Sequence, residues 1–249
     1  MRIDTSALIG LMAMILIGAI APISALAVDQ LSSSTQAGPK APTGEFFAGG
    51  VLTENTWISW AGVVKSLSAS LYEEGWRIRL LGAYGRYGFE TNGQPNFANP
   101  ALFEITPGYQ FKTGPVISKI FVGLHGEHHK IANPDPDNKA NGMGYGAKII
   151  SENWIDLPKN SFASLDASFS SLNTSYQGML RAGSAYFYRQ LTLGPEMQIL
   201  GNEEYYQFRA GLFGRWKQPG GSLEASIGYA LDYDEKSTPY ASVSWLRRF

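Results

Sequence analysis

The sequence ends with the segment Thr238-Pro239-Tyr240-Ala241-Ser242-Val243-Ser244-Trp245-Leu246-Arg247-Arg248-Phe249. Most of its apolar side chains fall on one parity, and small polar side chains fall on the other. A period of two is the spacing of side chains along a β-strand, so the segment predicts a strand with one apolar and one mostly polar face. The apolar parity is that of Ala241, Val243, Trp245 and Phe249, and the other parity holds Tyr240, Ser242 and Ser244.

The terminal aromatic residue, Phe249, favours a particular kind of strand. An exposed Phe is unusual at the end of a soluble domain, whereas an aromatic ring suits the boundary between the apolar band of a membrane barrel and water. A final Phe after alternating apolar residues resembles the C-terminal insertion signal of bacterial outer-membrane barrels. Arg247 departs from that signal, which usually has an apolar or aromatic residue there. An ordinary C-terminal edge strand is the alternative.

The composition agrees with β structure at a membrane and excludes other classes of protein. The chain has 249 residues, a net charge of −1 and 16% charged residues, without the basic clusters that nucleic-acid binding needs. Its mean hydropathy of −0.13 is too low for a bundle of membrane-spanning helices. The 28 Gly, 13 Tyr, 13 Phe and 6 Trp suit antiparallel strands with aromatic girdles, and the cysteine count of 0 excludes stabilisation by disulfides.

The N-terminal part of the sequence predicts an exported protein. Residues 1–27 combine a basic start, an apolar run over Ala7–Ile23 and an A-x-A cleavage motif at Ala25-Leu26-Ala27, as in a signal peptide. A retained membrane anchor is the alternative. Residues 28–44 have no apolar period and predict a flexible start of the mature chain. Residues 45–249 form the predicted barrel domain.

From Glu45 onward, segments of period two alternate with turn-forming clusters. Many of the segments match the roughly 9–11 residues that cross a bilayer when a strand is tilted, whereas soluble strands average about 5–6 residues. We therefore predict an all-β fold, an antiparallel up-and-down transmembrane β-barrel of about twelve strands. A soluble periplasmic sandwich is the alternative, because parity alone does not say which face meets water. The segments are Glu45–Leu52, Trp57–Leu67, Gly75–Phe89, Ala101–Phe111, Val116–His129, Gly142–Ser151, Ser161–Ser170, Tyr176–Tyr188, Leu191–Leu200, Tyr205–Trp216, Ser222–Asp232 and Pro239–Phe249.

The connections predict the orientation of the barrel. An even number of strands places both termini on one side, and outer-membrane barrels have short periplasmic turns and longer outer loops. The even-numbered connections are mostly short, so we expect both termini in the periplasm. Short even connections are Lys112–Pro115, Arg189–Gln190 and Lys217–Gly221, long odd ones are Glu90–Pro100 and Lys130–Asn141, and the long even exceptions are Ser68–Glu74 and Glu152–Asn160.

Charged residues on the polar parity are predicted to face the barrel lumen. Two interpretations are open: cross-strand networks that neutralise these charges, which we favour, or a hydrated lumen that accepts a polar polymer or an ion. Carbohydrate binding favours aromatic residues beside carboxylates, and the tryptophans are candidates for it, but we favour an interface girdle for them. They are Trp57, Trp60, Trp76, Trp154, Trp216 and Trp245. The lumen-facing candidates are Arg77, Arg79, Glu104, Lys119, Lys148, Asp166, Arg181, Glu196, Arg209, Arg215, Glu224 and Asp232.

All 3 histidines lie in the segment His125-Gly126-Glu127-His128-His129. His125, Glu127 and His129 share one face of a strand, so they are candidate ligands for a divalent metal. His125, His128 and His129 are also candidates for an outer-membrane lipid hydrolase, although the neighbouring sequence contains no recognisable nucleophile motif. We favour a polar strand end at the interface, with no metal, cofactor or catalytic residue. The segment Asn133–Asn138 resembles a calcium loop only superficially, because it lacks the spacing of an EF-hand.

Several stretches, taken in order, carry a family resemblance. They are Glu45–Gly50, Trp76–Tyr87, Asn133–Asn138 before Gly142, Gly194-Pro195-Glu196 followed by Tyr205–Gly211, and Ser237–Val243. In this order they resemble the cellulose biosynthesis BcsS family, over residues 45–249. The resemblance implies a non-enzymatic accessory role in bacterial cellulose synthesis or secretion at the outer membrane. It brings no catalytic motif with it.

The expected function is thus a monomeric outer-membrane barrel that helps to make, pass or anchor an extracellular β-glucan. The implied partners are outer-membrane lipid, a cellulose or other β-glucan chain, and subunits of the cellulose synthase complex, and no nucleic acid. A general porin for small solutes and the lipid hydrolase described above are the alternative functions.

Overall fold

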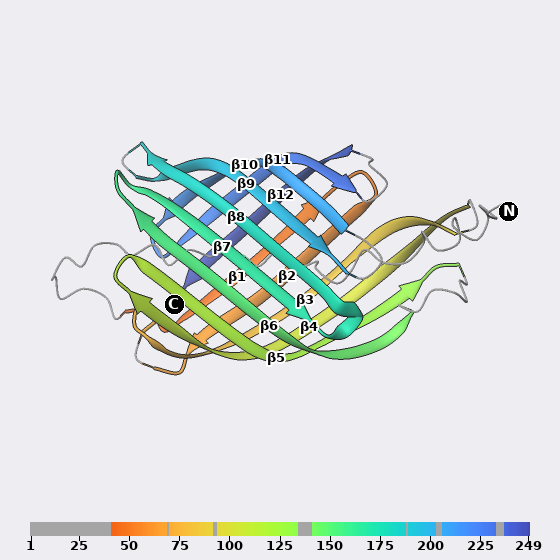
Figure 1. The fold of residues 1–249 in the computed structure, drawn as a ribbon, viewed down its shortest axis with the longest axis horizontal. Coiled ribbons are helices and arrows are strands. Elements are labelled where there is room, and N and C mark those ends of the chain that lie inside the picture. Colours follow the sequence, from red (N-terminus) through yellow and green to blue (C-terminus); the bar gives the residue numbers. More distant parts are fainter. Residues whose placement is uncertain are drawn as a thin grey trace, which may run out of the picture.

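The computed structural model describes residues 41–68, 70–91, 94–133, 141–187, 189–202, 206–232 and 237–249. The predicted signal peptide, residues 28–40 and most of the segment compared with a calcium loop lie outside these ranges. Within them, no helix has the length and apolar character needed to cross a bilayer. The described residues form one closed antiparallel barrel (Figure 1). Its strands are β1 (Gly44–Leu52), β2 (Thr56–Ser66), β3 (Gly75–Thr91), β4 (Gln94–Thr113), β5 (Val116–Ile131), β6 (Gly142–Leu157), β7 (Ser161–Ser170), β8 (Ser175–Tyr186), β9 (Leu191–Gly201), β10 (Tyr206–Gln218), β11 (Gly221–Asp232) and β12 (Ser237–Arg248).

The first and last strands close the sheet. β1 pairs with β12 in the register that sets Phe47 opposite Leu246, and β12 also pairs with β11. The C-terminal carbonyl of Phe249 accepts hydrogen bonds from the backbone N–H groups of Thr43 and Gly44, at 2.8 and 3.0 Å. The prediction of a closed antiparallel barrel is therefore confirmed. The alternatives of a C-terminal edge strand and of a two-sheet sandwich are wrong, because every strand has a neighbour on both sides.

Two predicted connections prove to be mostly strand. The ladder between β3 and β4 continues to the pair Thr91–Gln94, so Glu90–Pro100 is not a long loop. Likewise β6 runs on to Leu157, through most of the predicted connection Glu152–Asn160. The prolines and asparagines of these stretches suggested turns. Pro100 has no N–H to donate, and the β3–β4 ladder is interrupted beside it, but the pairing resumes beyond it at Tyr87–Ala98.

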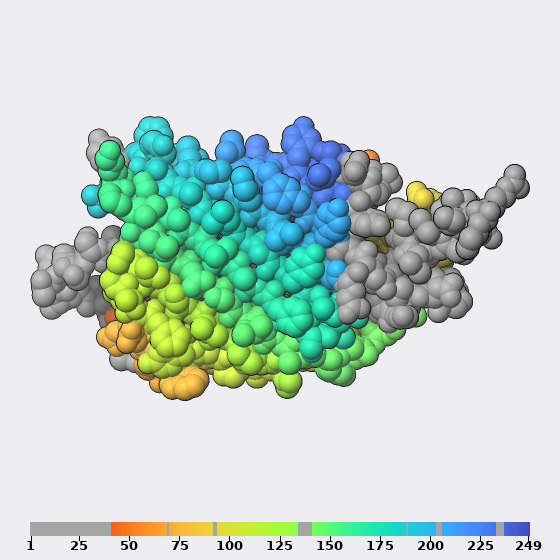
Figure 2. Space-filling view, in the orientation of Figure 1, coloured from red at the N-terminus to blue at the C-terminus, as the bar shows by residue number. Residues whose placement is uncertain are grey.

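The two faces of the sheet differ in polarity. On β3, Trp76, Leu80 and Tyr84 point outward and are 60%, 42% and 51% exposed, whereas Arg77 and Arg79 point inward and are buried. Figure 2 shows one side of this outer surface as a continuous wall of side chains from β5 to β11. An apolar outer face and a charged inner face are the arrangement of a barrel that sits in lipid.

The tryptophan prediction is wrong for two residues. Trp57, Trp76, Trp216 and Trp245 are exposed on the outer face, but Trp60 and Trp154 are buried inside the barrel. Trp60 belongs to an interior apolar cluster with Phe47 of β1, and the ring of Phe47 lies where Gly62 of β2 has no side chain. The interior therefore contains apolar packing as well as charge. The cluster comprises Phe47, Val51, Ile58, Trp60, Val64, Leu81, Tyr87, Ala98, Leu102, Ala230 and Tyr240.

The barrel has two unlike ends. At one end β1 begins and β12 ends; we call it the terminal end, and it also holds the connections at residues 114–115, 158–160 and 219–220. At the opposite end, which we call the loop end, the hairpins β3–β4 and β5–β6 project beyond the other strands, to the right in Figure 1. The short 3-10 helix η2 (Leu172–Thr174) joins β7 to β8 at the loop end.

Candidate functional site in the barrel interior

The charged residues of the inward parity lie inside the barrel. Asp232, at the end of β11, is half-buried, and the others are buried. Since an isolated buried charge is costly, the question for each is which group compensates it. The buried members are Arg77, Arg79, Glu104, Lys119, Lys148, Asp166, Arg181, Glu196, Arg209, Arg215 and Glu224.

Glu104 is the centre of the first ion-pair network. One of its carboxylate oxygens accepts a hydrogen bond from Arg79 on the neighbouring strand β3, at 2.6 Å. The other oxygen is paired with Lys148 of β6, which lies two strands away because β5 stands between β4 and β6. The network thus joins strands that do not pair with each other, and it leaves neither oxygen of the carboxylate unpaired.

A second network joins β8, β9, β10 and β11. Arg181 contacts Glu196 at 2.8 Å and Glu224 at 2.7 Å, and Arg215 contacts Glu224 at 2.7 Å. Glu196 also accepts a hydrogen bond from the Tyr240 hydroxyl of β12, at 2.9 Å. Two guanidinium groups against two carboxylates make this region electrically balanced.

Aromatic rings surround part of this second network. The guanidinium of Arg215 lies 5.5 Å from the ring centroid of Trp154 and 5.3 Å from that of Phe162. These two rings stack on each other at 3.8 Å. Contacts of this kind stabilise a guanidinium that has little water around it. They explain why Trp154 lies inside the barrel and not in the outer girdle.

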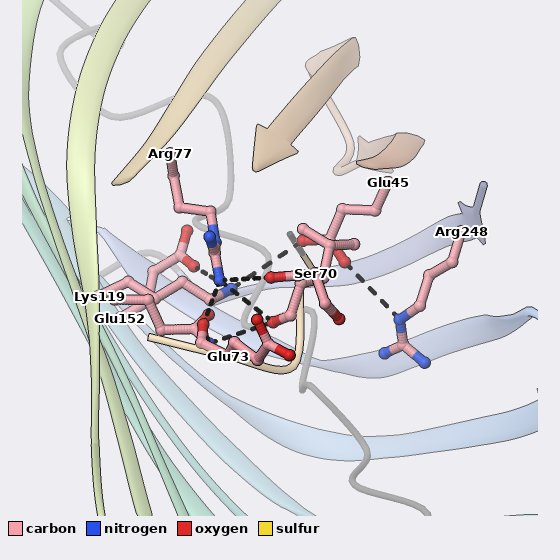
Figure 3. A network of polar contacts seen from close by, with 9 residues as sticks. Glu45, Ser70, Glu73, Arg77, Lys119, Glu152 and Arg248 are labelled. Carbon is pink, nitrogen blue, oxygen red and sulfur yellow. Dashed lines mark hydrogen bonds and ion pairs between the residues drawn. The ribbon is translucent and has the colours of Figure 1, made fainter. Parts of the chain in front are cut away.

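The third network lies at the terminal end (Figure 3). Lys119 of β5 donates a hydrogen bond to Glu152 of β6 at 3.1 Å and lies 4.0 Å from Glu45 of β1. Arg248 of β12 lies 3.8 Å from the other oxygen of Glu45. Glu45 thereby connects β1 and β12, the two strands that close the barrel, to β5 across the interior.

The connection between β2 and β3 folds into the barrel at the same end. Leu71 is 3% exposed, and Tyr72 packs against an interior apolar cluster that includes Ile117 and Phe213. The backbone N–H of Leu71 donates to the carbonyl of Pro42, at 2.9 Å. We call residues 67–68 and 70–74 the inner connection, since they cover the interior from the terminal end.

Two buried side chains hold the inner connection by its backbone. The guanidinium of Arg77 donates hydrogen bonds to the carbonyls of Ser70, Leu71 and Glu73 and to the Ser66 hydroxyl. The amide of Gln110 donates to the carbonyls of Leu71 and Glu73, at 3.1 and 2.9 Å. Figure 3 shows Arg77 pointing at this stretch of backbone. The hydrogen bonds of Arg77 thus go to peptide carbonyls and a hydroxyl.

The candidate histidines separate into two environments. His128 is exposed on the outer face, while His125 and His129 are buried on either side of Glu127. The Nε2 atoms of His125 and His129 lie 3.0 and 3.2 Å from the two oxygens of this carboxylate. The other ring nitrogen of His125 is 2.8 Å from the hydroxyl of Ser170 on β7.

This histidine arrangement is compact but closed. His125 and Ser170 are fully buried, and the Ser170 hydroxyl also accepts a hydrogen bond from the backbone N–H of Leu172, at 3.2 Å. The carboxylate stands between the two imidazoles, so the three groups contact one another and do not surround a common point. Across the described ranges, no group of three or more His, Asp or Glu side chains is arranged to hold a metal ion.

Asp166 of β7 is the exception to the pairing of interior charges. It is fully buried, and no side chain of the described residues donates a hydrogen bond to its carboxylate. In the β6–β7 register it stands directly opposite another carboxylate, Glu152. Burial and a like charge both disfavour an ionised Asp166.

We expect Asp166→Asn to raise the free energy of unfolding by about 1 kcal/mol, because the amide keeps the shape of the side chain and avoids the cost of burying a carboxyl group opposite Glu152. Urea unfolding of the folded barrel in lipid vesicles would measure the change. Glu152→Gln is the matched control and should have the opposite sign, since Glu152 is paired with Lys119. A destabilised Asp166→Asn variant would contradict this account of the site.

Some residues of the interior were not predicted from the sequence. Glu45, Gln110 and Ser170 were not identified, although each is buried and makes contacts described above. Inward parity was the available signal for Gln110 and Ser170, since they share the faces of Glu104 and Asp166 on their strands. Their partners lie on other strands or in the inner connection, which the sequence pattern does not specify.

Comparison with known proteins places the chain by fold and by family. Three solved structures share the fold at low sequence identity. The KdgM porin matches with a TM-score of 0.51 and 9% identity, over 82% of this chain and 99% of that one. The β domain of the Bordetella autotransporter BrkA matches with a TM-score of 0.51 and 14% identity, over 84% of this chain and 100% of that one. A TodX deletion mutant, a monoaromatic hydrocarbon channel, matches with a TM-score of 0.52 and 9% identity, over 85% of this chain and 91% of that one.

These likenesses concern the fold, which is that of outer-membrane barrels. No curated protein matches the chain by sequence. A family model, described as cellulose biosynthesis protein BcsS, matches residues 46–249, which include almost the whole barrel. The resemblance predicted from the ordered sequence motifs is therefore confirmed, and the chain belongs to the cellulose biosynthesis protein BcsS family.

Proposed function

We propose that this chain is a non-enzymatic accessory component of bacterial cellulose synthesis or secretion, placed in the outer membrane. The family match supports the link to cellulose. The observation that carries the membrane placement is the closed barrel, whose outward residues are mostly exposed and apolar while most of its buried charges are paired inside. A closed sheet satisfies its backbone hydrogen bonds internally, as a lipid environment requires.

The connections support an orientation with both ends of the barrel domain in the periplasm. With twelve strands, β1 starts and β12 ends on the same side. The connections at this terminal end are two to four residues long at 114–115, 158–160, 187–190 and 219–220, apart from the inner connection. Most connections at the loop end are as short, so the difference between the ends lies in the hairpins β3–β4 and β5–β6, which project beyond the other strands there. Longer parts are typical of the outer side of outer-membrane barrels, so these hairpins face the cell exterior.

The barrel acts beside the polymer and is not its conduit. Three ion-pair networks and three apolar clusters occupy the interior, and the inner connection covers the terminal end. A β-glucan chain would have to displace buried, paired charges in order to pass. The barrel is a monomer that contacts the polymer or subunits of the cellulose synthase complex through its ends.

Deletion of the gene in the native cellulose-producing bacterium tests the role. We expect less extracellular cellulose in the deletion strain, with the protein itself recovered in outer-membrane fractions and resistant to carbonate washing. Complementation with the wild-type gene should restore the cellulose. Unchanged cellulose in the deletion strain would refute the accessory role, and release of the protein by carbonate would refute the membrane placement.

Two measurements address the alternative functions. A porin requires sizeable ion conductance in planar bilayers, whereas a filled interior predicts little. A hydrolase that uses the contact between His125 and Ser170 requires the Ser170 hydroxyl as nucleophile. Complementation with Ser170→Ala should restore cellulose fully, since the hydroxyl is buried and we assign it a structural role.

A further inference from the structure

The two ends of the barrel differ in the charges that their described residues expose. Besides Arg77, Lys119 and Arg248 of the interior, six basic residues lie at the terminal end, one at or just after the end of each even-numbered strand: Lys65, Lys112, Lys159, Arg189, Lys217 and Arg247. Lys217 is half-buried and the other five are exposed. The acidic side chains exposed at this end are Glu73, Glu74 and Asp156. At the loop end, the exposed charges of the described residues are balanced: Arg86 and Lys130 against Glu54 and Glu90.

The even distribution of these cations follows from the topology. Lys65, Lys112, Lys217 and Arg247 lie at or near the ends of β2, β4, β10 and β12, and Lys159 and Arg189 lie in the turns after β6 and β8. Each alternate strand ends at the terminal end of an up-and-down barrel, so the six residues are spread around its circumference. We call these six residues the basic ring.

Exposed aromatic rings accompany the basic ring. Phe111 precedes Lys112, Trp216 precedes Lys217, and Trp245 stands two residues before Arg247 on the same outward face. The side chains of Phe111, Trp216 and Trp245 are 45%, 44% and 42% exposed. Lys65 places its Nζ atom 5.5 Å from the ring centroid of Phe249.

An aromatic ring followed by a cation marks the boundary between the apolar band and the headgroups of a bilayer. Long basic side chains reach from that boundary toward phosphate groups. We infer that the basic ring binds the phosphate groups of anionic phospholipids in the leaflet at the terminal end. The inference rests on the proposed placement of the barrel in a membrane.

The position of the ring distinguishes lipid from other anionic partners. An acidic protein or an anionic cell-wall polymer would dock on the end face of the barrel. That face is covered by the inner connection, where Glu73 and Glu74 are exposed. The six cations surround this face at the circumference, next to the outward aromatic rings. Their charge is therefore presented to the surrounding lipid.

Quenching of tryptophan fluorescence by brominated lipids tests the inference on the folded mature protein. The probes are vesicles of phosphatidylcholine that contain either dibrominated phosphatidylglycerol or dibrominated phosphatidylcholine, at low ionic strength. We expect the wild type to prefer phosphatidylglycerol over phosphatidylcholine by roughly fivefold. Added salt should reduce this preference, because it screens exposed charges.

Two double variants provide the matched comparison. Lys159→Gln with Arg189→Gln removes two charges from the basic ring, and Arg86→Gln with Lys130→Gln removes two from the loop end. The first pair should lower the preference by roughly twofold or more, and the second should leave it unchanged. Heat-modifiable mobility on gels would show that each variant is folded.

Three outcomes would overturn the inference. The first is a wild type without lipid preference, and the second is an equal effect of the two double variants. The third would indicate an anionic cell-wall polymer as the partner: the protein sediments with peptidoglycan, and the basic-ring variant loses this sedimentation but keeps its lipid preference. Cellulose production is measured separately in the deletion strain. A failed lipid test with an intact cellulose phenotype would therefore remove the lipid inference alone.

Discussion

Replacing Glu104 with leucine is expected to lower the free energy of unfolding of the barrel by about 3–5 kcal/mol. The substitution leaves Arg79 and Lys148 buried without their common partner. These two side chains are 3% and 5% exposed, so water does not replace the carboxylate. Urea unfolding in phospholipid vesicles, followed by tryptophan fluorescence, would measure the loss.

Two further variants show whether the lost pairing is the cause. Glu90→Leu removes an exposed carboxylate from the end of β3 and should change the free energy of unfolding by less than about 0.5 kcal/mol. The triple variant with Arg79→Met, Glu104→Leu and Lys148→Met removes all three charges and should recover much of the stability. A triple variant that is less stable than Glu104→Leu alone would contradict the assignment.

Removing the two side chains that hold the inner connection should expose it to protease. Arg77→Ala combined with Gln110→Ala deletes every side-chain donor to the carbonyls of Leu71 and Glu73 that the structure shows. Hydrogen bonds from a charged donor contribute about 1.5–3 kcal/mol each. We expect cleavage by chymotrypsin near Leu71 and Tyr72 to become faster by on the order of 100-fold.

The single variants and an unrelated arginine complete this experiment. Arg77→Ala alone should have a smaller effect, because Gln110 still donates to both carbonyls. Arg86→Ala removes an exposed guanidinium at the loop end and should leave the cleavage rate unchanged. Equal rates for the wild type and the double variant would show that the inner connection is held by other contacts.

The alternation of side chains allowed the barrel and much of its interior to be predicted. Arg77 and Arg79 are inward on the parity opposite Trp76 and Leu80, and the same rule identifies the buried Arg181 and Glu224. Parity is a local property, since each residue's face follows from its neighbours in the chain. The number of strands followed from the same pattern.

The sequence did not predict which residues these side chains contact, because the contacts depend on strand register and on which side chains meet across the interior. Ser170 reaches His125 across the intervening strand β6, and Glu104 reaches Lys148 across β5. The sequence predicted only a long connection at Ser68–Glu74, yet Ser70 and Leu71 are buried. Turn-forming composition does not distinguish a turn that folds outward from one that folds into the barrel.

The pairing of β1 with β12 sets an order on how the chain can mature. The sheet has its full set of neighbours only when the most recently synthesised segment meets the earliest one of the barrel. Until then, β1 and β12 each offer an unpaired row of backbone groups that could recruit another chain. Contacts between residues so distant in sequence form slowly. A newly made chain is therefore most exposed to aggregation before β1 and β12 pair. A chaperone that shields the open edges would determine what fraction of the chains reaches the closed barrel.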